Sequence, residues 1–394
     1  MPGKSSQLNT ELSGQNQRLL ALFETAGHEF IDPEIIQPAD VFLERAGEDI
    51  RSRTYVFSDP DGNELCLRPD ITVPACRYHL ANAPTPQTPA RYCYAGPAFR
   101  HHSAGVRNRN GSPREFEQIG LEWFGATDAV GAEAEIFNLT IAAVELAGLK
   151  NYTVRLGDLG LFHALLSSIE MPERWRRRLA REFWRPRDFY KLLRRLTGEQ
   201  PEKETSVSGL VERLALSGDN NPRALIEQIL QENDWALVPG RSCDEIADRL
   251  AEKAADKNSP PLDTESASQI NNYLNIHGDL KNVQAKLSAI ARQSAGGFAA
   301  GVETLGKRSA MFDLDGMKNG TISFAAEFGR ALEYYTGFVF QIEVTDVDGG
   351  PLVIAGGGRY DDLISDIGNC PTVPAVGSAI YSERLLAAIK RQDQ

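Results

Sequence analysis

Apolar residues recur at helical spacing near both ends of the first 150 residues, and at strand spacing between them. Residues 12–26 and 131–148 show helical periodicity, and Gly148 ends the second stretch. Residues 29–125 hold short β-rich runs separated by Gly, Pro and Asp turns, namely EFIDPEII, RTYVFSD, ELCLRPD, ARYCYAG and LEWFG. The pattern predicts an antiparallel sheet flanked by helices.

The pattern changes after about residue 165, where the chain becomes almost wholly helical and less apolar. Strand signals resume after residue 310 with TISFAAEF, FVFQIEV and PLVIAGGG, and a helix closes the chain. Because sheet signals lie on both sides of the helical stretch, we expect one α+β core from residues 1–165 and 310–394. Residues 166–309 are then a helical insertion.

The charge balance argues against a nucleic-acid-binding protein. The chain has 394 residues, with 54 acidic and 42 basic residues and a net charge of −12. A broad nucleic-acid surface needs clustered Lys and Arg, so tRNA is not an expected partner. The exception is residues 174–195, which hold ten Lys or Arg residues. This segment fits a solvated helical face, intramolecular pairing, a surface for an acidic protein partner, or RNA contact.

The cysteines indicate a reduced protein. The five are scattered, without zinc-ligand spacing, so neither a disulfide framework nor a structural metal is expected; they are Cys66, Cys76, Cys93, Cys243 and Cys370. The polar N-terminus lacks a secretory signal, and no apolar run is long enough to span a membrane. We expect a cytoplasmic protein without cofactor.

Polar residues gather in four clusters that hold hydrogen-bond donors and acceptors suited to a ligand site. These are LRPDIT at 67–72, the strand–loop–strand at 96–122, RALEYYTG at 330–337, and AGGGRYD with GSAIYSERL between 355 and 385. In the second cluster, Gln118 and Glu122 share one strand face by their period of two. The glycine spacing excludes a GxGxxG fingerprint and a GxxxxGK phosphate loop.

In this order, the four clusters resemble the catalytic domain of class II aminoacyl-tRNA synthetases, most closely histidyl-tRNA synthetase. FRHH…REFEQIGLE resembles class II motif 2, and GSAIYSERL resembles motif 3. ALEYYTGFVF and AGGGRYDDL resemble the two histidine-specific signatures. The resemblance implies a class II synthetase-like fold and a pocket for free L-histidine. Its residues would be Asp70, Thr72, Arg100, Gln118, Glu122, Arg330, Tyr334, Tyr335 and Tyr360.

The resemblance also implies a role for most of these residues. Asp70 and Thr72 would face the α-amino group of histidine, and Gln118 and Arg330 its carboxylate. Glu122, with Tyr335 and Tyr360, would define the imidazole end. A site that pairs both ring nitrogens rejects apolar side chains of the same shape, because its own polar groups would remain unpaired.

Three departures separate this chain from a synthetase. His102 stands where the synthetase has a glutamate that serves ATP and the tRNA end, and Asp70-Ile71 replaces Glu-Gly. Ten residues follow Arg384, where the synthetase continues into an anticodon-binding domain. This pattern resembles the regulatory subunits of ATP phosphoribosyltransferase. It implies a non-catalytic homodimer that joins a short-form catalytic subunit in a hetero-oligomer and transmits histidine feedback.

Two other interpretations remain. One is a histidine-activating ligase, which would need nucleotide at a remnant site around Arg100 and Arg384. The other is a dimeric scaffold with a dead pocket, which the joint survival of Gln118, Glu122, Arg330 and Tyr335 disfavours.

Overall fold

The computed structural model describes residues 5–43, 53–101, 113–199, 251–292, 296–329 and 334–393. The chain divides into two compact units. The first comprises Met1–Ser168 and Asn272–Gln394, and the second Ile169–Asn271. The helical insertion at residues 166–309 stays a prediction. The second compact unit is shorter than that range, because residues 272–309 belong to the first unit.

A nine-stranded sheet forms the centre of the first unit. In spatial order its strands are β1 (Glu29–Phe30), β5 (Ala90–Phe99), β6 (Glu115–Phe124), β12 (Ala375–Tyr381), β11 (Pro351–Arg359), β10 (Phe338–Thr345), β7 (Tyr152–Asp158), β9 (Gly320–Ala325) and β8 (His277–Gly278). Neighbours from β5 to β7 are antiparallel, whereas β1–β5 and β7–β9 are parallel. The prediction of an α+β fold with a largely antiparallel sheet is confirmed.

A smaller sheet follows β1 in the chain. It has the order β2 (Ile36–Pro38), β4 (Glu64–Leu67) and β3 (Tyr55–Ser58). The turn between β3 and β4 is closed by Asp59, whose carboxylate accepts from the backbone N–H groups of Asp61 and Asn63. This sheet leads the chain into the helix that borders the site.

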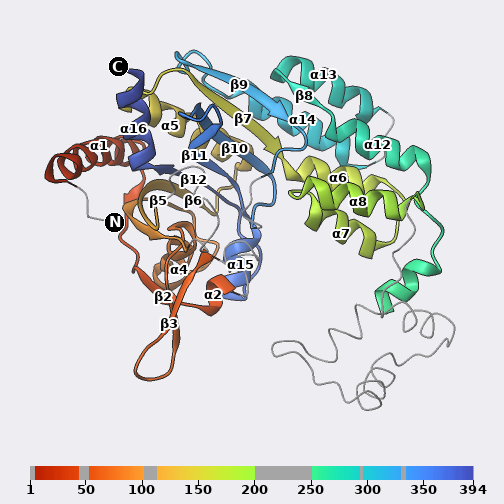
Figure 1. The fold of residues 1–394 in the computed structure, drawn as a ribbon, viewed down its shortest axis with the longest axis horizontal. Helices are drawn as coiled ribbons and strands as arrows, with labels where there is room; N and C mark the ends of the chain where they lie inside the picture. Colours follow the sequence, from red (N-terminus) through yellow and green to blue (C-terminus); the bar gives the residue numbers. More distant parts are fainter. Residues whose placement is uncertain are drawn as a thin grey trace. The chain divides into compact units, whose positions relative to one another are not determined.

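Three helices pack on one another and on β6, β11 and β12 (Figure 1). They are α1 (Ser6–Thr25), α5 (Ala129–Ala147) and α16 (Ser382–Gln392). Ser5 and Asp128 cap the first two helices by accepting from backbone N–H groups. Gly148 ends α5 with φ of 100°, a left-handed conformation that favours glycine. The predicted helices 12–26 and 131–148 correspond to α1 and α5.

A second helical group packs against sheet residues in one apolar cluster. It consists of α2 (Asp40–Leu43), α4 (Thr72–Asn82) and α15 (Asp362–Gly368). The cluster joins Val73 and Cys76 of α4 to Tyr94 of β5 and to Tyr360, just after β11. The start of α4 is therefore fixed over the middle of the sheet.

A buried ion network lies where α14 meets α5 in the first unit. The helices here are α6 (Leu159–Ser168), α13 (Leu280–Ala291) and α14 (Gly297–Ala310). Arg308 donates to Glu133 and, at 2.8 Å, to Asp158, and all three are buried. Arg359, at the end of β11, reaches the other oxygen of Glu133 at 3.2 Å. The network connects two helices with the ends of β7 and β11.

The described part of the second unit includes α7 (Glu173–Glu182), α8 (Pro186–Leu196) and the start of α12 (Thr264–Leu274). Arg174 and Arg178 both pair with Asp256, which also accepts from the indole N–H of Trp175. Part of the basic segment is therefore paired within the chain. None of the described helices is long and apolar enough to cross a membrane.

Candidate functional site

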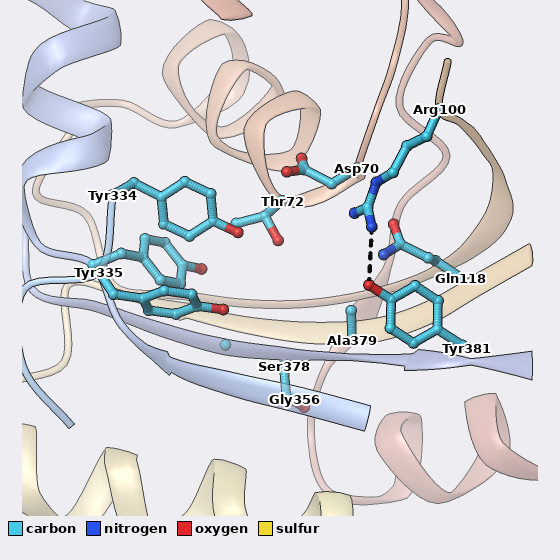
Figure 2. A pocket seen from close by; sticks show the side chains of 12 residues that line it. Asp70, Thr72, Arg100, Gln118, Tyr334, Tyr335, Gly356, Ser378, Ala379 and Tyr381 are labelled. Carbon is cyan, nitrogen blue, oxygen red and sulfur yellow. Dashed lines mark hydrogen bonds between the residues drawn. The ribbon is translucent and has the colours of Figure 1, made fainter. Parts of the chain in front are cut away.

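A cavity opens in the first unit, between the sheet and the start of α4 (Figure 2). Its lining residues are Asp70, Thr72, Arg100, Gln118, Tyr334, Tyr335, Gly356, Tyr360, Gly377, Ser378, Ala379 and Tyr381. Of the residues expected to bind histidine, these include all except Glu122 and Arg330. Arg330 lies outside the described residues.

Asp70 stands at the turn into α4. Its Oδ1 accepts from the backbone N–H of Val73, which fixes the carboxyl at the helix start. Its Oδ2 is buried and has no hydrogen-bond partner among the described residues. Burial raises the pKa of this carboxyl, and the positive charge of Arg100 opposes the rise. This oxygen can accept a hydrogen bond from a ligand in the cavity.

Gln118 and Glu122 project from the same face of β6, as their spacing predicts. Register places Gln118 opposite Tyr381 and Glu122 opposite Gly377 of β12. The buried Oε1 of Gln118, like Oδ2 of Asp70, finds no partner in the described part of the chain. Two unpaired acceptors, Oδ2 of Asp70 and Oε1 of Gln118, therefore line one cavity. A ligand with N–H or O–H donors could satisfy both.

Glu122 lies fully buried beside the cavity rather than in its lining. The Tyr94 hydroxyl donates to its Oε1 at 2.9 Å, and the Tyr360 hydroxyl donates to its Oε2. Burial raises the pKa of Glu122 to about 7, although donors from Tyr360, Thr72 and Tyr94 favour the charged form. A cationic or N–H donor ligand would shift this carboxyl towards the charged form.

The raised pKa makes stability depend on pH. Glu122 binds its proton up to about pH 7 in the folded chain, whereas the unfolded chain loses it near the ordinary glutamate pKa of about 4.3. Between these values the unfolded state binds fewer protons, so the free energy of unfolding should fall as pH rises. Urea unfolding at about pH 5 and about pH 7 should show a smaller fall for Glu122→Gln than for the unaltered chain. Equal falls would contradict this assignment.

Gly377 leaves the space that Glu122 occupies. A Cβ at Gly377 would overlap Oε2 of Glu122 and would lie 2.8 Å from the backbone oxygen of Leu121. We expect Gly377→Ala to displace Glu122 and to lower the free energy of unfolding by about 1–3 kcal/mol. Gly350→Ala is the control, because a Cβ there meets nothing within 4 Å. Equal urea midpoints for the two variants would contradict the expectation.

Three tyrosines form one end of the cavity. The rings of Tyr334 and Tyr335 lie 4.8 Å apart, and that of Tyr360 lies 5.7 Å from Tyr334 and 6.3 Å from Tyr335. Figure 2 shows Tyr334 and Tyr335 at the end away from Arg100, Gln118 and Tyr381. The cavity thus has an aromatic end and a cationic end, with Asp70 between them.

Arg100 and Arg384 are both held close to Tyr381. Arg100 donates to the backbone oxygen of Pro69 at 3.0 Å and to the Tyr381 hydroxyl at 3.2 Å. Arg384 donates to the backbone oxygen of Val353, and its guanidinium carbon lies 4.2 Å from the centre of the Tyr381 ring. Arg100 lines the cavity, whereas Arg384 does not.

Sequence reasoning missed two side chains of this site, Tyr94 and Tyr381. Tyr94 lies on β5 opposite Gly120, so its ring passes over the glycine towards Glu122. A signal for Tyr94 was present in the sequence. Gly120, between Gln118 and Glu122, leaves room for a large side chain from the neighbouring predicted strand, which contains Tyr94. No group of three or more His, Cys, Asp or Glu side chains within the described ranges could hold a metal ion.

The comparisons with known proteins assign the fold to one class. The family model of histidyl-tRNA synthetase matches residues 9–237 and 226–385. A solved ATP phosphoribosyltransferase regulatory subunit/histidyl-tRNA synthetase from Bacillus halodurans covers 99% of this chain and 82% of its own, at 21% identity and a TM-score of 0.67. Histidyl-tRNA synthetase from Nostoc covers 100% and 76%, at 16% identity and a TM-score of 0.61. The chain is a class II synthetase-like protein of the histidyl type.

Curated relatives identify the family within this class. ATP phosphoribosyltransferase regulatory subunits of Brucella anthropi and Sinorhizobium fredii are 34% and 35% identical over 391 and 377 residues. The alignments cover 98% and 94% of this chain and 98% and 95% of those proteins. The chain belongs to the family of ATP phosphoribosyltransferase regulatory subunits, and its role is regulatory rather than catalytic. The resemblance seen in the sequence is thereby confirmed.

Proposed function

We propose that the cavity is a sensor for free L-histidine, through which this subunit controls the catalytic subunit of ATP phosphoribosyltransferase. The observation that carries the proposal is the pair of unpaired buried acceptors, Oδ2 of Asp70 and Oε1 of Gln118, beside the buried carboxyl of Glu122. An amino acid with a second nitrogen-bearing group supplies donors for all three. No apolar amino acid does.

The two ends of the cavity give the ligand an orientation. Asp70 receives the α-ammonium group, with Thr72 beside it, and Arg100 provides positive charge for the carboxylate. Arg330 belongs to the carboxylate end by the family resemblance. Glu122 pairs with the imidazole at the aromatic end, where Tyr335 and Tyr360 flank the ring. The polar network around Glu122 rejects isosteric apolar side chains.

The signal passes to a short-form catalytic subunit in a hetero-oligomer. Regulation requires that histidine bind the inhibited arrangement of the complex more tightly than the active one, because only differential affinity shifts an equilibrium. The proposal places both subunits in the cytoplasm, where the thiols of Cys66, Cys76, Cys93 and Cys370 stay reduced.

Within the complex this subunit forms a homodimer through its class II core. Exposed apolar side chains on and near β1, β2 and β3 support this surface; they are Phe30, Ile35, Ile36, Val56 and Phe57. Analytical ultracentrifugation of this chain alone reports directly on the dimer.

The test is formation of phosphoribosyl-ATP by a short-form catalytic subunit from the same source, with and without this chain, across a histidine titration. We expect the chain to raise the activity strongly and histidine to reverse the increase. Calorimetry on the chain alone should show histidine binding. An activity that this chain does not change would contradict the regulatory role, and an absence of binding at about 1 mM histidine would contradict the sensor.

A further inference from the structure

The ring of Tyr381 lies between Arg100 and Arg384, the two arginines of the remnant nucleotide site expected from the sequence. Tyr381 ends β12 and is 8% exposed. The Arg384 guanidinium carbon lies 4.2 Å from its ring centre, and the Phe116 ring centre lies 5.5 Å away at an interplanar angle of 49°. Arg100 donates to its hydroxyl at 3.2 Å. Tyr381 is thus held on three sides.

The groups around this ring form a slot with recognisable chemistry. A guanidinium face on one side and an aromatic ring on another bind a planar π-system by stacking and cation–π attraction. A second guanidinium at the end of the slot suits an anionic oxygen. A flat heterocycle that carries phosphate would satisfy the slot if the tyrosine ring were absent, and a nucleotide has this chemistry.

The charges of the slot support this description. Burial and the positive charge of Arg100 lower the pKa of the Arg384 guanidinium, whereas Tyr381 and Glu383 raise it. The positive charges of Arg100 and Arg384 therefore repel each other. Tyr381 lies between them, with its ring against Arg384 and its hydroxyl accepting from Arg100. Without the tyrosine, an anion would compensate both.

We propose that Tyr381 is a built-in occupant of a nucleotide-type slot, and that its side chain restricts the cavity to one ligand of amino-acid size. Register supports this role, because Tyr381 lies opposite Gln118 and its hydroxyl group reaches the cationic end of the cavity (Figure 2). The inference rests on the cavity of the proposed sensor but not on the identity of its ligand. It makes Tyr381 a specificity-determining residue that excludes nucleotides.

The test is ATP binding by the full chain, measured by calorimetry on the unaltered protein and on three variants. Tyr381→Ala removes the ring, Tyr381→Phe keeps the ring as a matched control, and Tyr381→Ala with Arg384→Ala removes one wall of the opened slot. We expect Tyr381→Ala to bind ATP at least about tenfold more tightly than the unaltered chain, the size of one stacking contact. The phenylalanine variant should resemble the unaltered chain, and the double variant should lose the gain.

Two results would overturn the proposal. One is ATP binding by the unaltered chain as tight as that of Tyr381→Ala, and the other is a folded Tyr381→Ala protein that gains nothing. If Tyr381→Ala does not fold, Tyr381→Ser takes its place. If neither variant folds, the ATP titration of the unaltered chain decides whether the proposal holds. In that titration, binding overturns the proposal and its absence supports it. L-histidine binding by the unaltered chain tests the sensor separately, so the two proposals can fail independently.

Discussion

Replacing Glu122 with alanine is expected to weaken histidine binding by roughly a hundredfold, since a buried charged acceptor and its hydrogen bonds disappear together. The Tyr94 and Tyr360 hydroxyls, which both donate to this carboxyl, would lose their acceptor. The imidazole would lose its partner at the aromatic end of the cavity. Isothermal calorimetry on the purified chain measures the effect directly.

The matched control is Glu145→Ala. Glu145 accepts from the Tyr152 hydroxyl at 2.7 Å, so this variant breaks the same kind of bond away from the cavity. We expect it to leave the histidine affinity within about twofold of the unaltered chain. If both variants bound histidine equally well, Glu122 would not be part of the sensor. If both lost binding, the loss would report general damage.

Replacing Arg308 with leucine is expected to lower the free energy of unfolding by about 3–5 kcal/mol. Arg308 is the buried cation that compensates Glu133 and Asp158, and its removal leaves two acidic groups inside the first unit with one remaining arginine, Arg359. Urea unfolding measures the loss.

The neighbouring residue provides the control. Lys307 pairs with Glu303 on the surface of the same helix, where both side chains are about two-thirds exposed. Lys307→Leu should change the free energy of unfolding by less than about 1 kcal/mol, as is usual for exposed pairs. Similar losses for the two variants would show that the buried network contributes no more than a surface pair.

Most of the sheet could be predicted from alternation and turns, but two central strands, β7 and β12, were not. Strand β7 (Tyr152–Asp158) pairs with β10 and β9. Its buried residues Tyr152, Val154 and Leu156 alternate with Thr153 and Arg155. The period of two was therefore present in the sequence, and the run was long enough for a strand. Its place directly after the helix that ends at Gly148 made it resemble a connection.

The site could be predicted only in part, for a geometric reason. Spacing within one strand places Gln118 and Glu122 on one face, and this inference needs no partner strand. The contacts of Glu122 with Tyr94 and Tyr360 depend on the register between neighbouring strands of the sheet, which a single sequence does not specify. The family resemblance supplied Tyr360, but neither route supplied Tyr94 or the clamped ring of Tyr381.

The bare backbone that lines part of the cavity, at Gly356 of β11 and Gly377 of β12, limits how this protein can evolve. Any side chain at Gly377 would enter the space of Glu122, so a substitution there displaces this carboxyl instead of changing which ligand the pocket prefers. If the cavity is the proposed histidine sensor, a lineage can thus lose its response in a single step. Acquiring a response to another metabolite requires changes elsewhere, at the start of α4 or at the paired tyrosines, where a new side chain can alter the chemistry without filling the space.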